Sequence, residues 1–289
     1  MADTASPTTA PARTRQLRLG HSPDSDDAFM FYGLASGKVA SPDLELRHEL
    51  RDIQTLNEMA MRGELEITAL SVHAYAHVWQ QYALLSHGAS MGQQYGPIVV
   101  AREPLTPDTL RGVRIAVPGY LTSAYLGLRL RLGRFDSVVV PFNQIMEQVA
   151  AGEVEAGLLI HEGQLTHGAL GLHTVLDLGV WWHEETGLPL PLGVNGIRRD
   201  LGDDLIRRLS DLLKESIAYG LAHRDEALAH AMQYAGDMPR ELADRFVGMY
   251  VNDLTLDIGS QGRESVELFL RRGYEAGILS DLPQVDWVG

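Results

Sequence analysis

His161 and Glu162 stand directly after an apolar run, residues 156–160, in the segment "EAGLLIHEGQLTH". An imidazole exchanges protons near neutral pH, and a neighbouring carboxylate can orient the ring. A histidine at the end of a buried strand has three interpretations: a hydrogen-bonded structural residue, a metal ligand or an acid–base group. The remaining sequence has to distinguish among them.

The histidine spacings do not favour a metal site. "HEGQLTH" separates His161 and His167 by six residues, whereas the zinc-protease pattern needs four, which places both rings on one side of a helix. His73 and His77 have that spacing, but "VHAYAHVW" is typical of a packed helix and no third ligand is evident.

An acidic element precedes the first expected helix. Asp24, Asp26 and Asp27 form the pattern DxDD, which could hold magnesium. Their position at a helix start favours helix capping or hydrogen bonds to ligand hydroxyls. No metal ligand is therefore assigned.

Three segments share one pattern, in which a short strand meets a Ser or Thr loop and passes into a helix. The strands are expected near 17–20, 65–70 and 113–117; the second leads to Ser71 and the third to Thr122 and Ser123. In parallel sheets ligands bind at the carboxyl ends of strands, and the N–H groups of helix N-termini favour anions. Ordinary N-capping is the alternative for each hydroxyl.

Composition restricts the class of function. The chain has 289 residues, 45% of them apolar, a formal charge of −14 and no cysteine. This charge argues against nucleic acid or an anionic membrane as the main partner, and the missing thiols exclude disulfides and thiolate chemistry. No GxGxxG, Walker or GxSxG motif is present, so we expect a cofactor-free site for a small molecule. A histidine whose pKa lies near the working pH contributes about 10²- to 10⁴-fold in such a site.

Strands alternating with helices predict an α/β protein with mostly parallel sheets and two lobes around a cleft. Helical patterns follow over 201–235, with a break near His223, and near 239–250 and 261–276. We expect the chain to cross between lobes near 96–104 and 193–199. The expected organisation is a disordered tail over 1–15, lobe 1 over 16–96 and 198–289, and lobe 2 over 97–197. The N-terminus lacks the apolar stretch of a secretory signal and no run is long enough to span a membrane, so a cytoplasmic protein is expected.

Ordered motifs resemble one enzyme family from about residue 17 to the last helix. The chain is similar to the 1,4-dihydroxy-6-naphthoate synthases of the futalosine route to menaquinone, through "GHSPDSDDAFMFYGLASGKV", "ALSVHAYAHV", "YGPIVVAR", "IAVPGYLTSAYL", "VEAGLLIHEGQLTH", "LDLGVWWHEETGLPLPLGVNGIRRDL" and "YVNDLTLDIG". The resemblance implies a fold like the type II periplasmic binding proteins. It also implies a lyase that cleaves cyclic dehypoxanthinyl futalosine to 1,4-dihydroxy-6-naphthoate.

The resemblance assigns roles to particular residues. His161 takes the place of the family's proton acceptor, and Ser71, Ser123 and Ala124 match substrate contacts. The usual SPCPND is here "SPDSDD", and the usual Lys-Leu-Ser is here Ala69-Leu70-Ser71, so a cationic contact is missing. Carboxylate recognition would then rest on helix N-termini or on an arginine such as Arg198. The expected substrate contacts are Ser22, Asp27, Ala69, Leu70, Ser71, Thr122, Ser123, Ala124, Asn195 and Arg198.

Two other functions stay open. One is the related chorismate dehydratase, against which the "HEGQLT" element argues. The other is a solute receptor without activity, since transport proteins share the fold; the lack of a signal sequence argues against it. The oligomeric state is left open.

Overall fold

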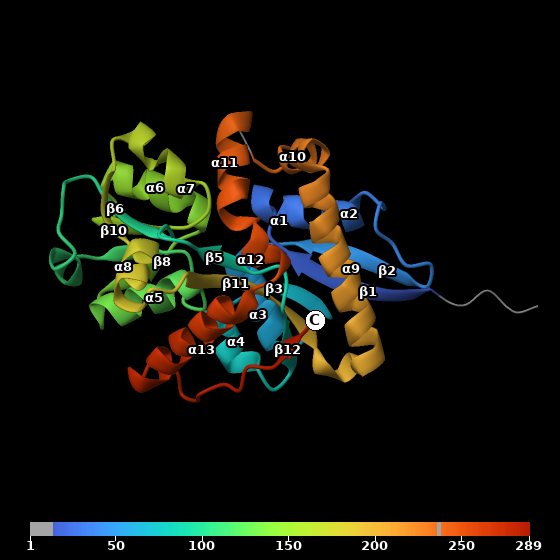
Figure 1. Cartoon of the computed structure of the whole chain (residues 1–289). Coiled ribbons are helices and arrows are strands. Elements are labelled where there is room, and N and C mark those ends of the chain that lie inside the picture. The colour runs from blue at the N-terminus through green and yellow to red at the C-terminus, as the bar shows by residue number, and fades with distance from the viewer. Residues whose placement is uncertain (1–13, 236–237) are drawn as a thin grey trace, which may run out of the picture.

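The structure is a computed structural model that describes residues 14–235 and 238–289. The tail expected over 1–15 falls mostly on residues 1–13, outside the described part. Two β-sheets, each with its own helices, form two lobes that lie side by side (Figure 1).

The first sheet belongs to lobe 1 and is built from both ends of the chain. Its strand order is β12 (Trp287–Val288), β4 (Tyr82–Leu85), β11 (Leu190–Arg198), β3 (Ile67–Ser71), β1 (Arg15–His21) and β2 (Leu44–Leu50), with β5 (Ser90–Gly92) pairing with β11. β1 is parallel to both β2 and β3, whereas β11 is antiparallel to β3 and β4. All five residues of β3 are buried, as expected of a central strand.

The second sheet belongs to lobe 2. Its order is β10 (His173–Asp177), β6 (Ile98–Ala101), β9 (Ala156–Leu159), β7 (Ile115–Val117) and β8 (Ser137–Val139). β7 is parallel to β8 and β9, and β6 is antiparallel to β9. Residues 156–159 of the apolar run before His161 therefore form an inner strand that is buried throughout, and the half-buried Ile160 follows it.

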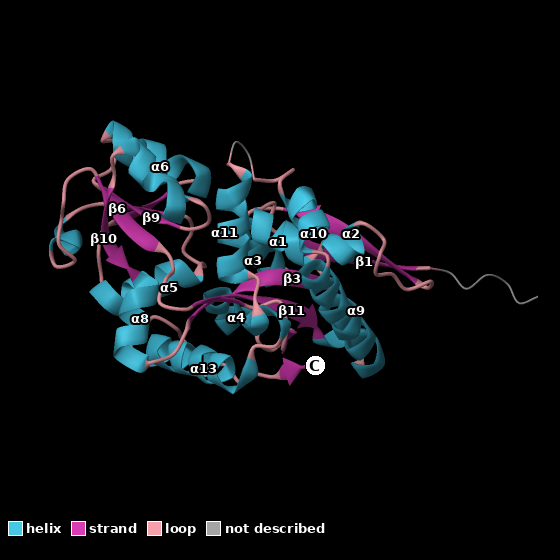
Figure 2. Cartoon of the chain, turned by 45° about the horizontal axis from the view of Figure 1, so that its top comes forward, coloured by secondary structure: helices cyan, strands magenta, loops and turns pink. Residues whose placement is uncertain are grey.

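Helices cover both sheets (Figure 2). Those of lobe 1 are α1 (Ser25–Met30), α2 (Tyr32–Ala35), α3 (Ile53–Met61), α4 (Val72–Val78), α9 (Asp203–Ala222), α10 (Arg224–Ala231), α11 (Arg240–Tyr250), α12 (Asp253–Leu256) and α13 (Gly259–Glu275). Those of lobe 2 are α5 (Ser123–Leu132), α6 (Phe142–Ala151), α7 (Gly163–Thr166) and α8 (Leu178–Thr186). Short 3₁₀ turns occupy Thr109–Gly112, His167–Leu170 and Arg199–Leu201.

Helical periodicity explains the longest helix. α9 buries Leu205, Leu209, Leu213 and Ile217, one residue per turn, against lobe 1. It ends at Ala222, and α10 begins at Arg224, so the expected break near His223 is confirmed.

The structure differs from the expected elements in two places. The first predicted helix is interrupted at Phe31, whose backbone (φ −92°, ψ 5°) leaves the helical region and divides it into α1 and α2. The second crossing between lobes comes before Leu190, earlier than the expected 193–199, because "LPLGVNGIR" is inserted as β11 into the first sheet. Lobe 2 is therefore shorter than 97–197.

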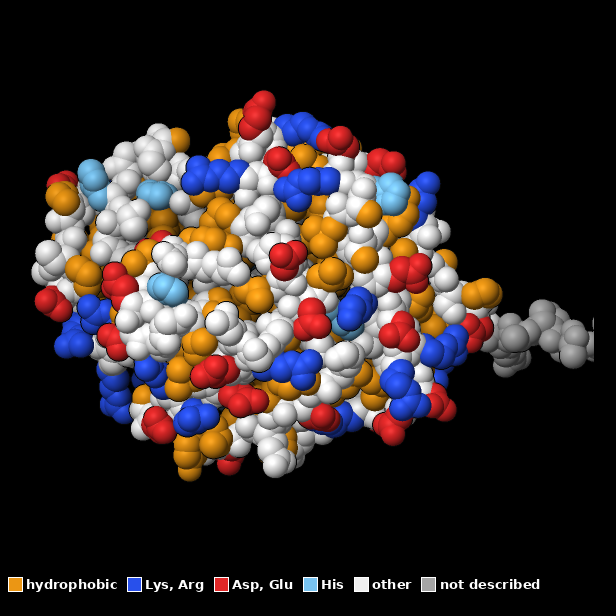
Figure 3. Space-filling model, in the orientation of Figure 1, with side chains coloured by type: hydrophobic (Ala, Val, Ile, Leu, Met, Phe, Trp, Pro, Cys, Tyr) orange, Lys and Arg blue, Asp and Glu red, His pale blue; other side chains and the backbone are white. Residues whose placement is uncertain are grey.

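Charged side chains of both signs are mixed over the face in Figure 3, which shows no basic patch. Among the described residues, no helix combines the length and apolar character that a bilayer crossing requires.

Candidate active site

One pocket lies where strand ends of both lobes meet. Its empty volume is about 740 Å³, counted out to open solvent at its mouth, which is in the range of small-molecule sites. Nine of the ten expected substrate contacts line it together with His161: Ser22, Asp27, Ala69, Leu70, Ser71, Thr122, Ser123, Ala124 and Asn195.

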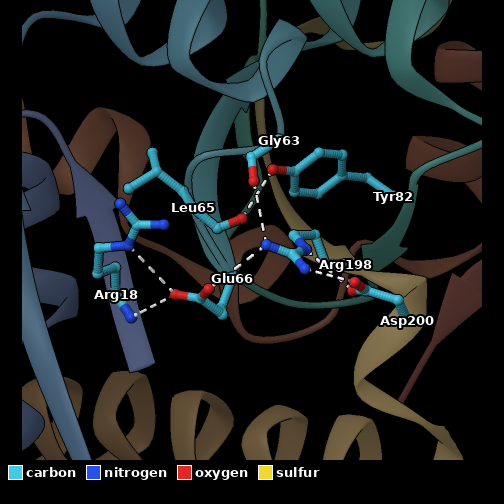
Figure 4. Close-up of polar contacts among 7 residues, drawn as sticks. All are labelled: Arg18, Gly63, Leu65, Glu66, Tyr82, Arg198 and Asp200. Carbon is cyan, nitrogen blue, oxygen red and sulfur yellow. Dashed lines mark hydrogen bonds and ion pairs between the residues drawn. The ribbon is translucent and has the colours of Figure 1, made fainter. Parts of the chain in front are cut away.

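Arg198, the tenth, lies outside this pocket, so the expectation that it contacts the ligand there is wrong for this structure. Its side chain donates to the Gly63 carbonyl (3.0 Å) and to Asp200 Oδ1 (2.9 Å), and it pairs with Glu66 (Figure 4). It is the last residue of β11, whereas Asn195, in the same strand, reaches the pocket. The pocket lining contains neither lysine nor arginine.

His161 meets Asp24 across the pocket. The loop after β9 in lobe 2 carries His161, and the start of α1 in lobe 1 carries Asp24; Nδ1 lies 2.8 Å from Asp24 Oδ2, with both side chains largely buried. Phe142 of α6 packs edge-on against the ring, with 4.8 Å between centroids. The other ring nitrogen, Nε2, is buried and has no hydrogen-bond partner in the described chain.

Asp24 changes the protonation of this histidine. Burial alone would lower the pKa of His161, but the charge and hydrogen bond of Asp24, helped by the charges of Glu162 and Asp26, raise it to about 9. That is well above the ordinary histidine value of 6.5. Burial would raise the pKa of Asp24, and the charge and hydrogen bond of His161 overcome this effect and lower it. In the ligand-free protein at neutral pH the two therefore form an ion pair.

Three further carboxyl groups surround the pair. Burial and the charge of Asp24 raise the pKa of Asp26 to about 7, and burial and the charge of Asp26 raise the pKa of Asp27. Burial and Asp24 likewise raise the pKa of Glu162. Asp27 also accepts the Ser22 N–H at 2.6 Å, which orders the loop after β1.

Ser71, in contrast, has a neutral polar partner, Asn57. Asn57 of α3 donates to Ser71 Oγ (2.9 Å) and accepts the Ser71 N–H (2.9 Å). The Ser71 hydroxyl proton has no acceptor among the described residues. Ser71 therefore retains a donor for a ligand.

The start of α5 is held differently. Thr122 Oγ1 accepts the Tyr125 N–H (3.2 Å) and donates to the Gly119 carbonyl, as an N-cap does. Ser123 Oγ donates to the Leu192 carbonyl of β11 (2.5 Å), so its proton is already used. The N–H groups of Ser123 and Ala124, the first two of the helix, are left for a ligand acceptor.

Two residues in or behind the pocket, Tyr250 and Asn57, carry no sequence signal of function. Tyr250 donates to Gln164 Oε1 (2.7 Å), joining α11 to α7 beside the pocket. Asn57 is fully buried behind Ser71. Asn195, which was expected, donates to the Gly88 carbonyl (3.3 Å), and its buried Oδ1 has no partner in the described chain. The helical pattern places Tyr250 and Asn57 on inner faces, but no motif marks them as functional.

The metal hypotheses receive no support. No group of three or more potential metal-ligating side chains occurs in residues 14–235 and 238–289. His73 packs against His77, with 5.6 Å between ring centroids, and its Nδ1 lies 3.3 Å from the Thr122 carbonyl. The two residues belong to the packed helix that the sequence indicated.

Comparisons with known proteins agree with this architecture. A solved structure from Archaeoglobus fulgidus is 45% identical, with a TM-score of 0.88 over 91% of this chain and 98% of that one. The alkanesulfonate-binding protein of Xanthomonas axonopodis shares the fold alone, at 14% identity and a TM-score of 0.72 over 95% of this chain and 97% of that one. The fold is that of the periplasmic binding proteins.

Two curated relatives share one name. A Thermus thermophilus protein named 1,4-dihydroxy-6-naphthoate synthase is 45% identical over 93% of this chain and 97% of its own length. A Streptomyces coelicolor protein of the same name is 36% identical over 92% of this chain and 95% of its own length. A family model described as menaquinone biosynthesis matches residues 17–275. The pocket and its histidine thus occur in a chain that belongs to the menaquinone biosynthesis family.

Proposed function

We propose that this protein is a carbon–carbon lyase that converts cyclic dehypoxanthinyl futalosine to 1,4-dihydroxy-6-naphthoate. The observation that carries the proposal is the state of the two ring nitrogens of His161, a residue that lines the pocket: Nδ1 contacts Asp24, and the buried Nε2 has no partner among the described residues. One ring nitrogen is thus fixed and the other is left for a substrate. The relatives' shared name supplies the product.

The chemistry needs one proton acceptor. Nε2 of a neutral His161 takes the proton of a sugar hydroxyl, and the O–H electron pair becomes the π bond of a carbonyl. The adjacent carbon–carbon bond breaks, and its electron pair stays on the ring fragment, which takes up a proton as it becomes aromatic. Aromatisation supplies the driving force, and the electron count requires no oxidant or cofactor.

Recognition of the naphthoate carboxylate has to proceed without a lysine or arginine, because the pocket lining contains neither. The Ser71 hydroxyl and the free N–H groups of Ser123 and Ala124 are the donors available, and the α5 N-terminus favours an anion. The carboxylate would lie at this side, and the sugar hydroxyls would face His161 and the acidic residues.

The test is turnover by purified protein. Incubation with cyclic dehypoxanthinyl futalosine and no added cofactor should yield 1,4-dihydroxy-6-naphthoate on chromatography. His161→Ala and His161→Asn should fold normally and lose at least about 10²-fold in kcat, as expected when a general base is removed. Near wild-type turnover by either variant would sink the role of His161. Chorismate dehydration, or ligand binding without turnover, would replace the function altogether.

The pH profile tests the direction of proton transfer. With a pKa of about 9, roughly one site in a hundred carries neutral His161 at pH 7. If His161 accepts the proton, kcat/KM should rise with pH and level off near pH 9. A profile that falls through pH 9 would make His161 a proton donor instead.

A further inference from the structure

Asp24 and His161 come from different lobes. Asp24 follows β1 of the first sheet, and His161 follows β9 of the second. Their contact, 2.8 Å from Nδ1 to Oδ2, therefore exists only while the lobes lie together. Asp24 of lobe 1 thus holds the ring of His161, which belongs to lobe 2.

The Asp24 side chain does not cap its helix. It occupies the N-cap position of α1 yet accepts no hydrogen bond from that helix. Its carboxylate instead accepts the Ser22 hydroxyl and contacts His161. Both contacts concern the pocket, which Ser22, Asp24 and His161 line together.

His161 needs this support because its backbone is in the left-handed region, at φ +57°. A residue with a Cβ atom adopts that region at a cost and keeps it where surrounding contacts hold it. Phe142 and the His161 ring meet edge to face, and this contact does not fix the side-chain torsions of His161. The Nδ1 hydrogen bond to Asp24 fixes them.

We propose that Asp24 is the positioning residue of His161: it holds the imidazole by Nδ1 from across the pocket, so that Nε2 is the nitrogen that exchanges a proton with the substrate. This inference rests on the proposed function.

Other charges near the ring have to be considered with Asp24. Asp26 and Asp27 lie on the same helix, α1, and Glu162 follows His161 in the chain. Tyr250 of α11 lines the same pocket and is neutral, its pKa raised by burial. Among these groups only Asp24 both hydrogen-bonds the ring and contributes the largest favourable charge. Removing it should therefore change the titration of His161 more than removing any other carboxylate.

The first experiment reads the pair without substrate. Protein labelled with ¹⁵N-histidine is titrated by NMR, with the His161 signals identified by their loss in His161→Asn. Wild-type His161 should titrate near pH 9, and in its neutral form the proton should remain on Nδ1. A wild-type midpoint at or below 6.5, or a neutral form protonated on Nε2, would overturn the proposal with no variant needed.

Asp24→Asn and Asp24→Ala then test the position itself. Asp24→Asn should lower the His161 midpoint by at least about two pH units and move the rising limb of kcat/KM by the same amount. Asp24→Ala should also lose at least about tenfold in kcat at its own pH optimum, because nothing then orients the ring. An unmoved limb and midpoint in both variants would overturn the proposal.

Asp177→Asn is the matched control. Asp177 is a partly buried carboxylate that caps α8, accepting the N–H groups of Gly179 and Val180, and it lies outside the pocket. Because Asn caps helices about as well as Asp, this replacement should leave the melting temperature nearly unchanged and should not move the limb. A failure of the proposed function would look different: wild-type protein would show the expected titration but no turnover of cyclic dehypoxanthinyl futalosine. Asp24 would then still fix the ring but would not position it for this reaction.

Discussion

Two serines of the pocket differ in the state of their hydroxyl protons. Ser71 has a free donor, whereas Ser123 donates to Leu192. Ser71→Ala should therefore raise KM about 2- to 10-fold, the loss of roughly 0.5–1.5 kcal/mol, and Ser123→Ala should leave KM within about twofold while lowering the melting temperature. Steady-state kinetics and thermal unfolding measure both effects. Equal KM changes in the two variants would show that hydrogen-bond state does not decide which serine contacts the substrate.

Asp26 makes the stability of the protein pH-dependent. Burial and the charge of Asp24 raise its pKa from 3.8 to about 7, so the folded state disfavours the ionised form. Its stabilising contribution is present below pH 3.8 and is lost as pH rises through 7. Asp26→Asn stays neutral and should be more stable than wild type at pH 8, by up to about 4 kcal/mol, with little difference near pH 4. Chemical unfolding at both pH values checks this; a difference independent of pH would contradict it.

Residue types in the sequence indicated candidate site residues, and the structure shows which of them lie together in the pocket. His161 was identifiable because an apolar strand ended on it, and Ser71 and Ser123 because they began helices. The partner of His161 could not be read from the sequence, because Asp24 lies 137 positions away and looks like a helix cap. Arg198 was misassigned because a strand's sequence does not say which of its ends faces the pocket.

At the scale of elements, the start of α5 depends on its N-cap. Thr122→Ala removes the acceptor for the Tyr125 N–H and should cost about 1 kcal/mol of stability. It should also raise KM, because the N–H groups of Ser123 and Ala124 would lose their fixed direction. Asp177→Ala removes the cap of α8 away from the pocket and should lower stability with unchanged KM. An unchanged KM in Thr122→Ala would remove this helix start from substrate recognition.

Most elements followed from periodicity, and the exceptions have physical causes. The inner strands Ile67–Ser71 and Ala156–Leu159 are fully buried, and both sequences are short, mostly apolar runs, which predict inner strands. β11 was mistaken for a crossing because its glycines and proline are typical of loops, and its pairing with β3 and β4 overrides that local preference.

At the scale of the molecule, several contacts join the lobes around the pocket. Besides Asp24–His161, Tyr250 donates to Gln164, and Gln54 accepts the Leu121 N–H at 3.1 Å. If these contacts hold the two lobes together around the product, Tyr250→Phe should weaken product binding about 2- to 10-fold by removing one neutral hydrogen bond. Tyr274→Phe, at an exposed tyrosine outside the pocket, is the matched control. Calorimetric affinities that agree for both variants and wild type would show that this contact does not contribute to product binding.

The insertion of β11 between β3 and β4 also constrains the order in which the protein forms during synthesis. β1 to β4 leave the ribosome first, yet their sheet lacks the strand that joins β3 to β4 until residue 198 has been made. The sheet of lobe 2 needs only residues 98–177 and is complete before that point. Residues 98–177 can therefore fold before the first sheet is complete. Until then β3 and β4 have unpaired edges, which are prone to wrong pairing. Pausing translation beyond residue 198 should thus protect β1 to β4 from protease far better than pausing it shortly before Leu190.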